Sequence, residues 1–318
     1  MSLKIIKPGL FDSIQDAGRF GWQHLGINPT GAMDRFAASL ANALLGKDLH
    51  APVLEIHFPA AQLLFTKPAI ISITGAHFTP ELNDVTIPMN HPVKVHANST
   101  LKFTRQATGM RSYIGFLPGL QLKTWLHSFS TNTKAGAGGY NGRTLDAGDT
   151  IAFLNEEEAS NFPSNSGQLF SAKGYDYDLR SLRCIMGSEW NYLLASSGNG
   201  FLNNSFEITI ESDRMGYRLA GAKLEIENSE TLLSSPVAFG TIQLLPGGQM
   251  IILMADHQTT GGYAKIAHVI SADLPLLAQK QPGSMIRFVL TDLADAEKAF
   301  LEQQQYLRQV RAAVLLRS

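Results

Sequence analysis

Hydrophobic residues along most of the chain come in short runs that Gly, Pro, Asn and Asp interrupt. Runs of this length, rich in Ile and Val and bounded by turn-forming residues, predict β-strands. In the first half, the predicted strands are Leu3–Ile6, Gln62–Phe65, Ile70–Thr74, Val93–His96, Thr100–Phe103, Met110–Phe116 and Thr150–Phe153. In the second half, they are Leu182–Met186, Glu207–Glu211, Lys223–Ile226, Ala238–Leu244, Met250–Met254, Ile266–Ile270 and Met285–Leu290. The pattern therefore predicts an all-β protein with a few helices.

Two segments have helical spacing instead. Between Asp34, a good N-cap residue, and Gly46, which favours a helix end, apolar residues recur at steps of three and four. From about Asp292 to the C-terminus, apolar residues again share one face, namely Leu293, Ala296, Phe300, Leu307, Val310 and Val314. We expect the first helix to flank a sheet. The second is expected to dock on its own domain, with docking on a partner as the alternative.

The amino-acid composition changes near the middle of the chain, and this change predicts two domains. Residues 155–181 begin with the acidic run Glu156–Glu158 and continue with Asn, Ser, Pro and Gly, which is typical of a linker. We interpret the acidic run as a solvated surface without a function of its own. The expected division is an N-terminal β domain at 1–154, a linker at 155–181, and a C-terminal β domain with the final helix at 182–318.

The composition indicates which partners the protein can attract and in which cellular compartment it is expected. The formal net charge is −1 and only 17% of residues are charged, so the chain has no general attraction for nucleic acid or acidic membranes. Cys184 is the single cysteine, so no internal disulfide can form. The N-terminus lacks an apolar signal core, and no run approaches the roughly 18 apolar residues of a membrane helix. We expect a cytoplasmic protein.

Several familiar catalytic motifs are absent from the sequence. It contains no phosphate loop, no dinucleotide-binding glycine pattern, no zinc-binding helix or cysteine pair, and no nucleophile elbow. We therefore expect no metal site. Any chemistry would rest on carboxylates, amides, hydroxyls, Lys and Arg, a set suited to a small polar substrate or a phosphate.

One loop concentrates polar chemistry. The segment Asp256–Tyr263 follows the predicted strand Met250–Met254 and precedes Ile266–Ile270. It carries an acid, an imidazole, an amide, two hydroxyls and a Gly-Gly pair that gives backbone freedom. Loops held by rigid strands commonly carry function. The alternative is a polar hairpin connection with no further role.

Other polar segments accompany this loop. Gln15, Asp16 and Arg19 lie near the N-terminus, and Gly31-Ala32-Met33-Asp34 follows them. In the second half, Ser212–Leu219 contains Asp213, Arg214 and Arg218, and Gly240-Thr241-Ile242-Gln243 comes shortly before the loop. We also interpret Glu55, which follows an apolar run, as a buried partner of an Arg.

Taken together, these segments resemble the 5-oxoprolinase C subunit family, also called allophanate hydrolase subunit 2 or KipA, whose members carry a carboxyltransferase A/B domain. The resemblance rests on motifs in the family's order, namely Pro8-Gly9, Gln15-Asp16-x-Gly18-Arg19-x-Gly21, Thr30–Asp34, Ser128-x-Ser130-Thr131, Gly142-Arg143, Ser212–Leu219, Gly240–Gln243 and Ala255–Tyr263. The matches run from about residue 4 to 290. His77 departs from the pattern because the family usually has Asp there, which puts in doubt any role that needs a carboxylate at this position.

The resemblance implies two cyclophilin-like β-barrel domains in one chain. It also implies membership of an ATP-dependent 5-oxoprolinase, which opens 5-oxo-L-proline to L-glutamate and contains two further subunits, one KipI-like and one LamB/YcsF-like. One alternative is the carboxyltransferase part of a biotin-dependent urea or amide carboxylase. Another is a regulator without enzymatic activity that binds a kinase inhibitor. ATP would be used by the complex, and biotin would matter only for the carboxylase alternative.

We expect a site in a cleft between the two domains. The predicted catalytic residues are Asp256, Lys265 and Asp213. The predicted substrate-binding residues are Gln258, Thr259, Thr260, Tyr263, Arg214, Arg218, Gln243, Gln15, Asp16 and Arg19. Structural alternatives stand beside these roles: a turn cap for Asp256, a surface charge for Lys265, an internal Asp–Arg pair for Asp213 and its neighbours, and a satisfied core amide for Gln243.

Overall fold

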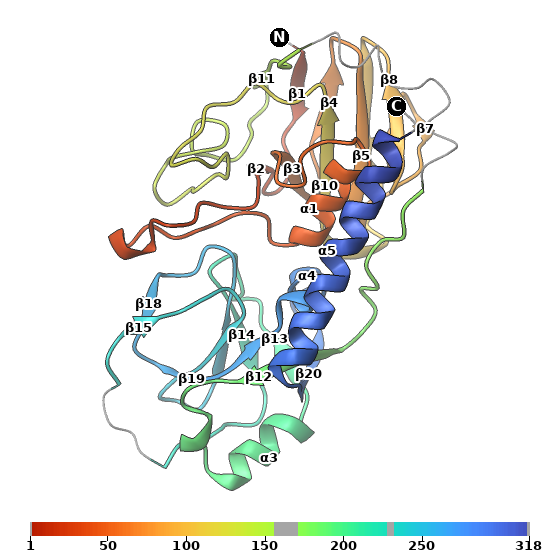
Figure 1. Cartoon of the computed structure of the whole chain (residues 1–318). Coiled ribbons are helices and arrows are strands. Elements are labelled where there is room, and N and C mark those ends of the chain that lie inside the picture. Colours follow the sequence, from red (N-terminus) through yellow and green to blue (C-terminus); the bar gives the residue numbers. More distant parts are fainter. Residues whose placement is uncertain (1, 156–170, 228–231, 317–318) are drawn as a thin grey trace. The chain divides into compact units, whose positions relative to one another are not determined.

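The computed structural model describes residues 2–155, 171–227 and 232–316. Contacts between residues divide the chain into two compact units (Figure 1). Unit 1 comprises Met1–Arg19, Asp34–Tyr175 and Gln304–Ser318, and unit 2 comprises Phe20–Met33 and Asp176–Gln303. Each unit thus includes a segment from the other half of the sequence. The acidic run at 156–158 lies outside the described residues.

Unit 1 is built from two antiparallel sheets. The six-stranded sheet has the order β11 (Thr150–Ile151), β1 (Leu3–Lys7), β4 (Gln62–Phe65), β9 (Ser99–Phe103), β6 (Pro80–Leu82) and β7 (Val85–Thr86). The five-stranded sheet has the order β2 (Ser13–Gln15), β3 (Val53–His57), β10 (Thr108–Leu117), β5 (Ala69–His77) and β8 (Pro92–Val95). One buried cluster takes side chains from both sheets, including Leu3 and Phe65 from the first and Ile71 and Phe116 from the second. The hydrophobic core therefore lies between the sheets.

Helix α1 (Arg35–Ala43) flanks the five-stranded sheet, as the sequence predicts. Its N-cap is Asp34, whose Oδ1 accepts a hydrogen bond from the Ala37 N–H at 2.8 Å. Strand hydroxyls bind the helix carbonyls: Ser72 donates to Ala41 O at 2.6 Å, and Thr74 donates to Ala37 O at 2.7 Å. These contacts join helix and sheet through polar groups as well as through apolar packing.

A buried polar network lies beneath the start of this helix. The Tyr113 hydroxyl accepts the Asp34 N–H and donates to Glu55 Oε2, both at 2.8 Å. Arg111 Nε is 4.0 Å from Glu55 Oε1, which confirms that Glu55 is a buried partner of an Arg. Burial, with the neighbouring Glu55 and Asp34 charges, raises the pKa of Tyr113 well above its usual value, so the hydroxyl remains a donor.

Unit 2 contains a closed seven-stranded barrel. The strand order is β12 (Ser181–Met186), β19 (Ala264–Val269), β16 (Thr241–Leu244), β17 (Met250–Leu253), β14 (Gly216–Ala220), β13 (Phe206–Ile208) and β20 (Met285–Leu290). The pairing of β12 with β20, which closes the ring, is parallel. Helix α3 (Ala195–Asn203) packs on the barrel through Phe201, whose ring stacks on Phe288 with centroids 4.6 Å apart. A short ribbon of β15 (Ser235–Pro236) and β18 (Thr260–Gly261) and the short helix α4 (Leu274–Ala278) complete the unit.

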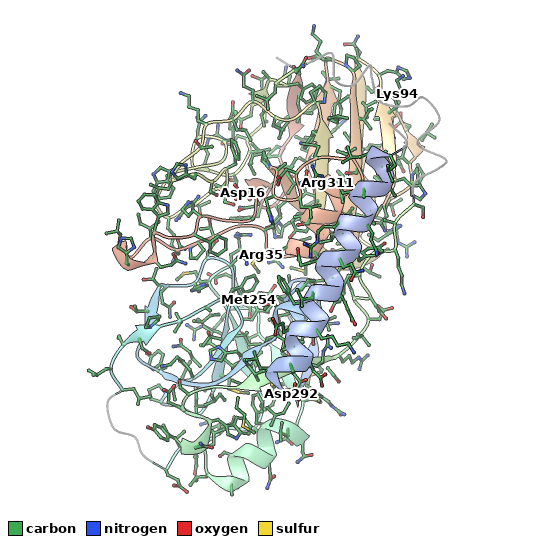
Figure 2. The ribbon with its side chains drawn as sticks, in the orientation of Figure 1. Asp16, Arg35, Lys94, Met254, Asp292 and Arg311 are labelled. Atoms are coloured by element: carbon green, nitrogen blue, oxygen red, sulfur yellow. The ribbon has the colours of Figure 1, made fainter. Side chains whose placement is uncertain are left out.

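The long C-terminal helix α5 spans Leu293–Leu315 (Figure 2). Ala296 and Ala299 pack with Ile270 and Ala272 of unit 2. Farther along, the helix packs on α1 of unit 1, with Leu307 and Val310 against Phe36, Leu40 and Leu44. The predicted helix is confirmed, but the predicted apolar face is partly wrong because Leu293 is 69% and Phe300 41% exposed.

Most of the strand predictions are confirmed, and the all-β class with a few helices is confirmed with them. The predicted strand Lys223–Ile226 is wrong: in this segment only Ile226 forms a β-bridge, an isolated one with Leu193. The predicted strand Ala238–Leu244 begins only at Thr241. The sequence predictions do not include β2, β3, β6, β7, β14, β15 and β18. In β3, the buried Glu55 interrupts the apolar pattern.

Replacing Tyr113 by Phe should destabilise the fold by about 2–4 kcal/mol, because the Asp34 N–H and the Glu55 carboxylate would each lose a buried partner. Urea unfolding followed by circular dichroism measures the change. Tyr192→Phe is the matched control: this ring is 43% exposed, and its loss of a hydroxyl should cost less than about 0.5 kcal/mol. Equal stability of the two variants would contradict the importance of the network.

Candidate functional site

The polar loop predicted from the sequence joins two strands that are not neighbours. Strand β16 pairs with β17 on one side and with β19 on the other, so residues 254–263 cross over β16 to connect the outer two. The hairpin alternative is therefore wrong. Within the loop, β18 pairs with β15 and holds the crossing segment in place.

Asp256, the acid of this loop, forms a two-point ion pair with Arg214. The Arg214 Nε and Nη2 donate to the two carboxylate oxygens at 2.9 and 3.0 Å, a geometry that only a guanidinium provides. Arg214 Nη2 also donates to Gly31 O at 2.7 Å, and Asn28 Nδ2 donates to the Asp256 carbonyl at 3.0 Å. Three segments far apart in the sequence therefore meet in unit 2. We call this arrangement the Arg214 clamp.

The other members of the charged segment are placed differently. Asp213 is exposed, and its Oδ1 accepts the N–H groups of Met215 and Gly216 at 2.8 and 3.1 Å, forming a turn cap. Arg218 is also exposed and lies 3.7 Å from Glu211. The segment therefore does not form one compact charged cluster, and the internal partner of Arg214 is Asp256 rather than Asp213.

A second polar cluster lies on one face of β16 and β19. Gln243 is opposite Lys265, and Thr241 is opposite His268, with a bulge between the two pairs. Residues directly opposite in antiparallel strands share a face of the sheet. Lys265 Nζ lies 3.2 Å from Glu189 Oε2, and Thr241 Oγ1 lies 3.1 Å from His268 Nδ1. We call Thr241, Gln243, Lys265, His268 and Glu189 the β16–β19 cluster.

Burial and charge set the protonation of this cluster. For Glu189, burial opposes ionisation, but the hydrogen bonds from Lys265 and Ser188 outweigh it and leave the pKa below its usual value. For His268, burial and then the Lys265 charge lower the pKa, so the imidazole is neutral at pH 7. The cluster thus combines a charged pair with a neutral imidazole, a hydroxyl and an amide.

Gln243 lies directly beside the loop at Gly261. A Cβ at position 261 would come too close to Gln243 Nε2, so a larger residue there would require the Gln243 side chain to shift. Gln243 is 1% exposed, and its Nε2 has no hydrogen-bond partner within the parts of the chain that the structure describes. A buried donor of this kind is costly unless an acceptor reaches it.

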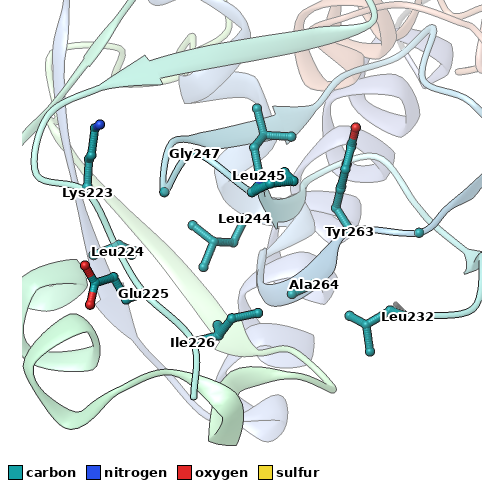
Figure 3. A pocket seen from close by; sticks show the side chains of 13 residues that line it. Lys223, Leu224, Glu225, Ile226, Leu232, Leu244, Leu245, Gly247, Tyr263 and Ala264 are labelled. Atoms are coloured by element: carbon teal, nitrogen blue, oxygen red, sulfur yellow. The ribbon is translucent and has the colours of Figure 1, made fainter. Parts of the chain in front are cut away.

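The remaining loop residues face outward to different degrees. Gln258, Thr260 and Tyr263 are exposed, whereas Thr259 is half-buried and its carbonyl accepts the Val237 N–H at 3.2 Å. Tyr263 lines a cavity of about 710 Å³ (Figure 3). Other residues that line it are Lys223, Leu224, Glu225, Ile226, Leu232, Leu244, Leu245 and Ala264. The cavity therefore exposes polar and apolar groups in similar measure, with Lys223 and Glu225 as its charged residues.

Gln15, Asp16 and Arg19 belong to unit 1 and are buried. The Asp16 carboxylate accepts hydrogen bonds from Gly18 N, Ser128 Oγ, Phe129 N and Ser130 Oγ. Arg19 donates to the Ser130 carbonyl and lies 4.6 Å from the ring centroid of Trp125. These groups hold together the irregular segment around Ser128–Thr131.

Sequence reasoning missed Glu189 and His268. His268 lies in an apolar run that reads as a plain strand, and Glu189 follows a strand in a segment without any motif. In a regular strand, residues three apart such as Lys265 and His268 point to opposite faces. The bulge between them in the β16–β19 pairing brings them to one face, and the sequence does not reveal that bulge. The short Gly187-Ser188-Glu189 sequence after β12 is the one local signal for a functional turn.

Comparison with known proteins identifies the family. The model of the family described as "Carboxyltransferase domain, subdomain A and B" matches residues 25–290. The chain belongs to this family. Among carboxyltransferase-domain relatives, a Haemophilus influenzae protein named as the C subunit of 5-oxoprolinase is 38% identical over 304 residues, covering 95% of each chain. An Escherichia coli protein of the same name is 35% identical over 308 residues, covering 97% of each.

The fold of this carboxyltransferase-domain protein is shared with a solved structure. The Kluyveromyces lactis urea carboxylase superimposes with a TM-score of 0.88 at 26% identity, over 97% of this chain and 29% of that chain. The expected resemblance is thereby confirmed. In the described part of the chain, no helix is long and apolar enough to cross a membrane.

Replacing Asp256 by Ala should destabilise the protein by about 3 kcal/mol, because Arg214 would remain as an uncompensated buried charge. Hydrogen exchange should accelerate at residues 28–31, which the Arg214 clamp holds through the Gly31 carbonyl and the Asn28 side chain. Glu211→Ala is the matched control, since its pair with Arg218 is exposed and should contribute less than about 1 kcal/mol. Unchanged exchange at 28–31 in Asp256→Ala would rule out the clamp.

Proposed function

We propose that this chain is one subunit of an ATP-dependent 5-oxoprolinase, which opens 5-oxo-L-proline to L-glutamate. The observation that supports this most is similarity over nearly the whole chain to two bacterial proteins named as the C subunit of 5-oxoprolinase. The similarity covers at least 95% of this chain and of each relative, so it extends to the relatives as wholes.

The β16–β19 cluster suits the chemistry of cyclic amide opening. In this reaction, ATP would phosphorylate the amide oxygen and water would attack the activated carbon, so negative charge develops on oxygen. On the same face of the sheet, Lys265 supplies a cation and Gln243 supplies an N–H donor that has no partner in the part of the chain that the structure describes. We assign Lys265 to the stabilisation of this charge and Gln243 to recognition of the substrate amide.

The loop and the clamp complete the proposed site. Gln258, Thr259, Thr260 and Tyr263 would supply further contacts to the substrate. Asp256 has both carboxylate oxygens bound by Arg214, so we assign it to holding the loop rather than to accepting a proton. Asp213 would also have a holding role, because its carboxylate caps the turn at Arg214 by accepting the Met215 N–H.

The proposed substrate-binding residues also include Arg218 and, in unit 1, Gln15, Asp16 and Arg19. Arg218 is exposed on β14 and would contact substrate or another protein of the complex. Gln15, Asp16 and Arg19 are buried in their own unit, and we propose that they shape a surface contributed by unit 1.

The proposed enzyme is a cytoplasmic complex. This chain would assemble with two further subunits, one KipI-like and one LamB/YcsF-like, and ATP would be used by the assembled complex. Because the sequence has no phosphate loop, we assign ATP to no residue of this chain.

A second candidate function is carboxyl transfer to urea or a related amide. It is favoured by the similarity to the urea carboxylase of Kluyveromyces lactis, of whose chain this protein spans 29%. Such a reaction would need biotin on a carrier outside this chain. A regulatory role without catalysis is the third candidate, and it requires only a binding surface.

The purified chain should show little activity alone, whereas mixing it with the KipI-like and LamB/YcsF-like subunits should give ATP hydrolysis that depends on 5-oxoproline. Lys265→Ala in the mixture should lower the rate by on the order of 10² or more, because an electrostatic contact to the developing charge is removed. Phosphate release with and without 5-oxoproline measures both effects.

Three outcomes separate the candidates. Absence of 5-oxoproline-dependent hydrolysis in the complete mixture would refute the first proposal. Activity that avidin abolishes would favour the carboxyl transfer candidate. Tight binding to a partner that Lys265→Ala leaves unchanged, without catalysis, would favour the regulatory candidate.

A further inference from the structure

We propose that Glu189 is the positioning residue for Lys265 and fixes the location of its ammonium group. The assignment of Lys265 to substrate rests on the proposed function, whereas the relation between the two residues rests on geometry alone. Glu189 precedes the short 3-10 helix η3 (Trp190–Tyr192), in a segment that sequence reasoning passed over.

A single carboxylate oxygen binds Lys265 at two points. Glu189 Oε2 accepts the Lys265 backbone N–H at 2.7 Å and lies 3.2 Å from Nζ. In the opposite direction, the Glu189 N–H donates to the Lys265 carbonyl at 3.2 Å. The carboxylate is therefore tied to the backbone of the same residue whose side chain it pairs with, so neither group can move independently.

The chain before Glu189 is built for this close approach. The Gly187 N–H donates to Ile266 O at 2.8 Å, which extends the pairing of β12 with β19 beyond the end of β12. A Cβ at position 187 would lie 2.0 Å from the Lys265 carbonyl oxygen, so only glycine fits here. The sequence Gly187-Ser188-Glu189 thus delivers a carboxylate to Lys265 at a fixed distance.

Because the Lys265–Glu189 ion pair is buried, the loss of one partner would strongly affect the other. The side chains of Lys265 and Glu189 are only 9% and 14% exposed, so the ammonium would be poorly compensated without its partner. An ammonium carries three donors, and Glu189 takes one of them. Since Gln243 is the cross-strand neighbour of Lys265, the remaining donors and the Gln243 amide can meet one substrate oxygen.

Chemical labelling tests the positioning directly. Acetic anhydride acylates unprotonated amines, and peptide mass spectrometry reports the rate at Lys265 in the purified full-length chain. Glu189→Gln should raise this rate by up to about tenfold, equivalent to about 1.4 kcal/mol of lost interaction, because Lys265 Nζ would lose the ion pair that holds it in place. Glu211→Gln is the matched control, because it also removes a carboxylate beside a cation in unit 2 and should leave labelling of Lys265 unchanged.

Kinetics in the three-subunit mixture test the consequence. Glu189→Gln should lower kcat for 5-oxoproline-dependent ATP hydrolysis by on the order of 10², with a smaller change in KM, because a misplaced group costs chiefly in the transition state. Glu189→Asp keeps the charge and should recover part of the rate. Thermal unfolding checks that each variant is folded, since a purely structural residue would lower Tm and leave the kcat of folded protein unchanged.

The outcomes are distinguishable from failure of the proposed function. Unchanged labelling of Lys265 in Glu189→Gln would overturn the inference, as would raised labelling with an unchanged kcat. If the wild-type mixture shows no 5-oxoproline turnover, the proposed function fails, and labelling alone decides whether Glu189 positions Lys265.

Discussion

The buried ion pair between Arg214 and Asp256 is the interaction on which the arrangement of unit 2 depends. It joins the turn before β14 to the loop that crosses β16. It also fixes a distant segment, in which Gly31 lies 183 positions from Arg214 and Asn28 lies 228 positions from Asp256. Removing either partner would leave the other as a buried charge without compensation. The position of each segment therefore depends on the other.

The polar groups of unit 2 divide into two kinds. The Arg214 clamp is satisfied by its own partners, and its geometry suits holding backbone in place. The β16–β19 cluster instead presents a cation and an amide N–H group that has no partner among the described residues, with a neutral imidazole beside them. Donors that lack acceptors are costly in a folded protein and are typical of sites completed by a ligand. In the proposed site, the strands β16 and β19 carry Gln243 and Lys265, and the loop between β17 and β19 would supply the further contacts.

Much of the fold could be predicted from local pattern. The α1 cap at Asp34, the start of α5 and most strands follow from spacing and composition, because these features depend on neighbours in the sequence. Strand β3 was missed because Glu55 interrupts its apolar run, and that charge is tolerated only through Tyr113 and Arg111. The segment Lys223–Ile226 has strand-like composition but lies beside the hairpin turn of β16 and β17, where Leu224 N donates to Gly248 O.

The sequence by itself determined the class of fold, the family and the residue types available for chemistry, since ordered motifs and apolar periodicity are properties of the chain alone. Only the tertiary structure decided which charges pair. Asp213 is adjacent to Arg214 in the sequence, yet Asp256 binds it, because strand pairing brings β14 beside β17 and turns Asp213 toward its own backbone. In the same way, the pairing of β12 with β19 brings Glu189 to Lys265 across 76 positions, a separation that no local pattern records.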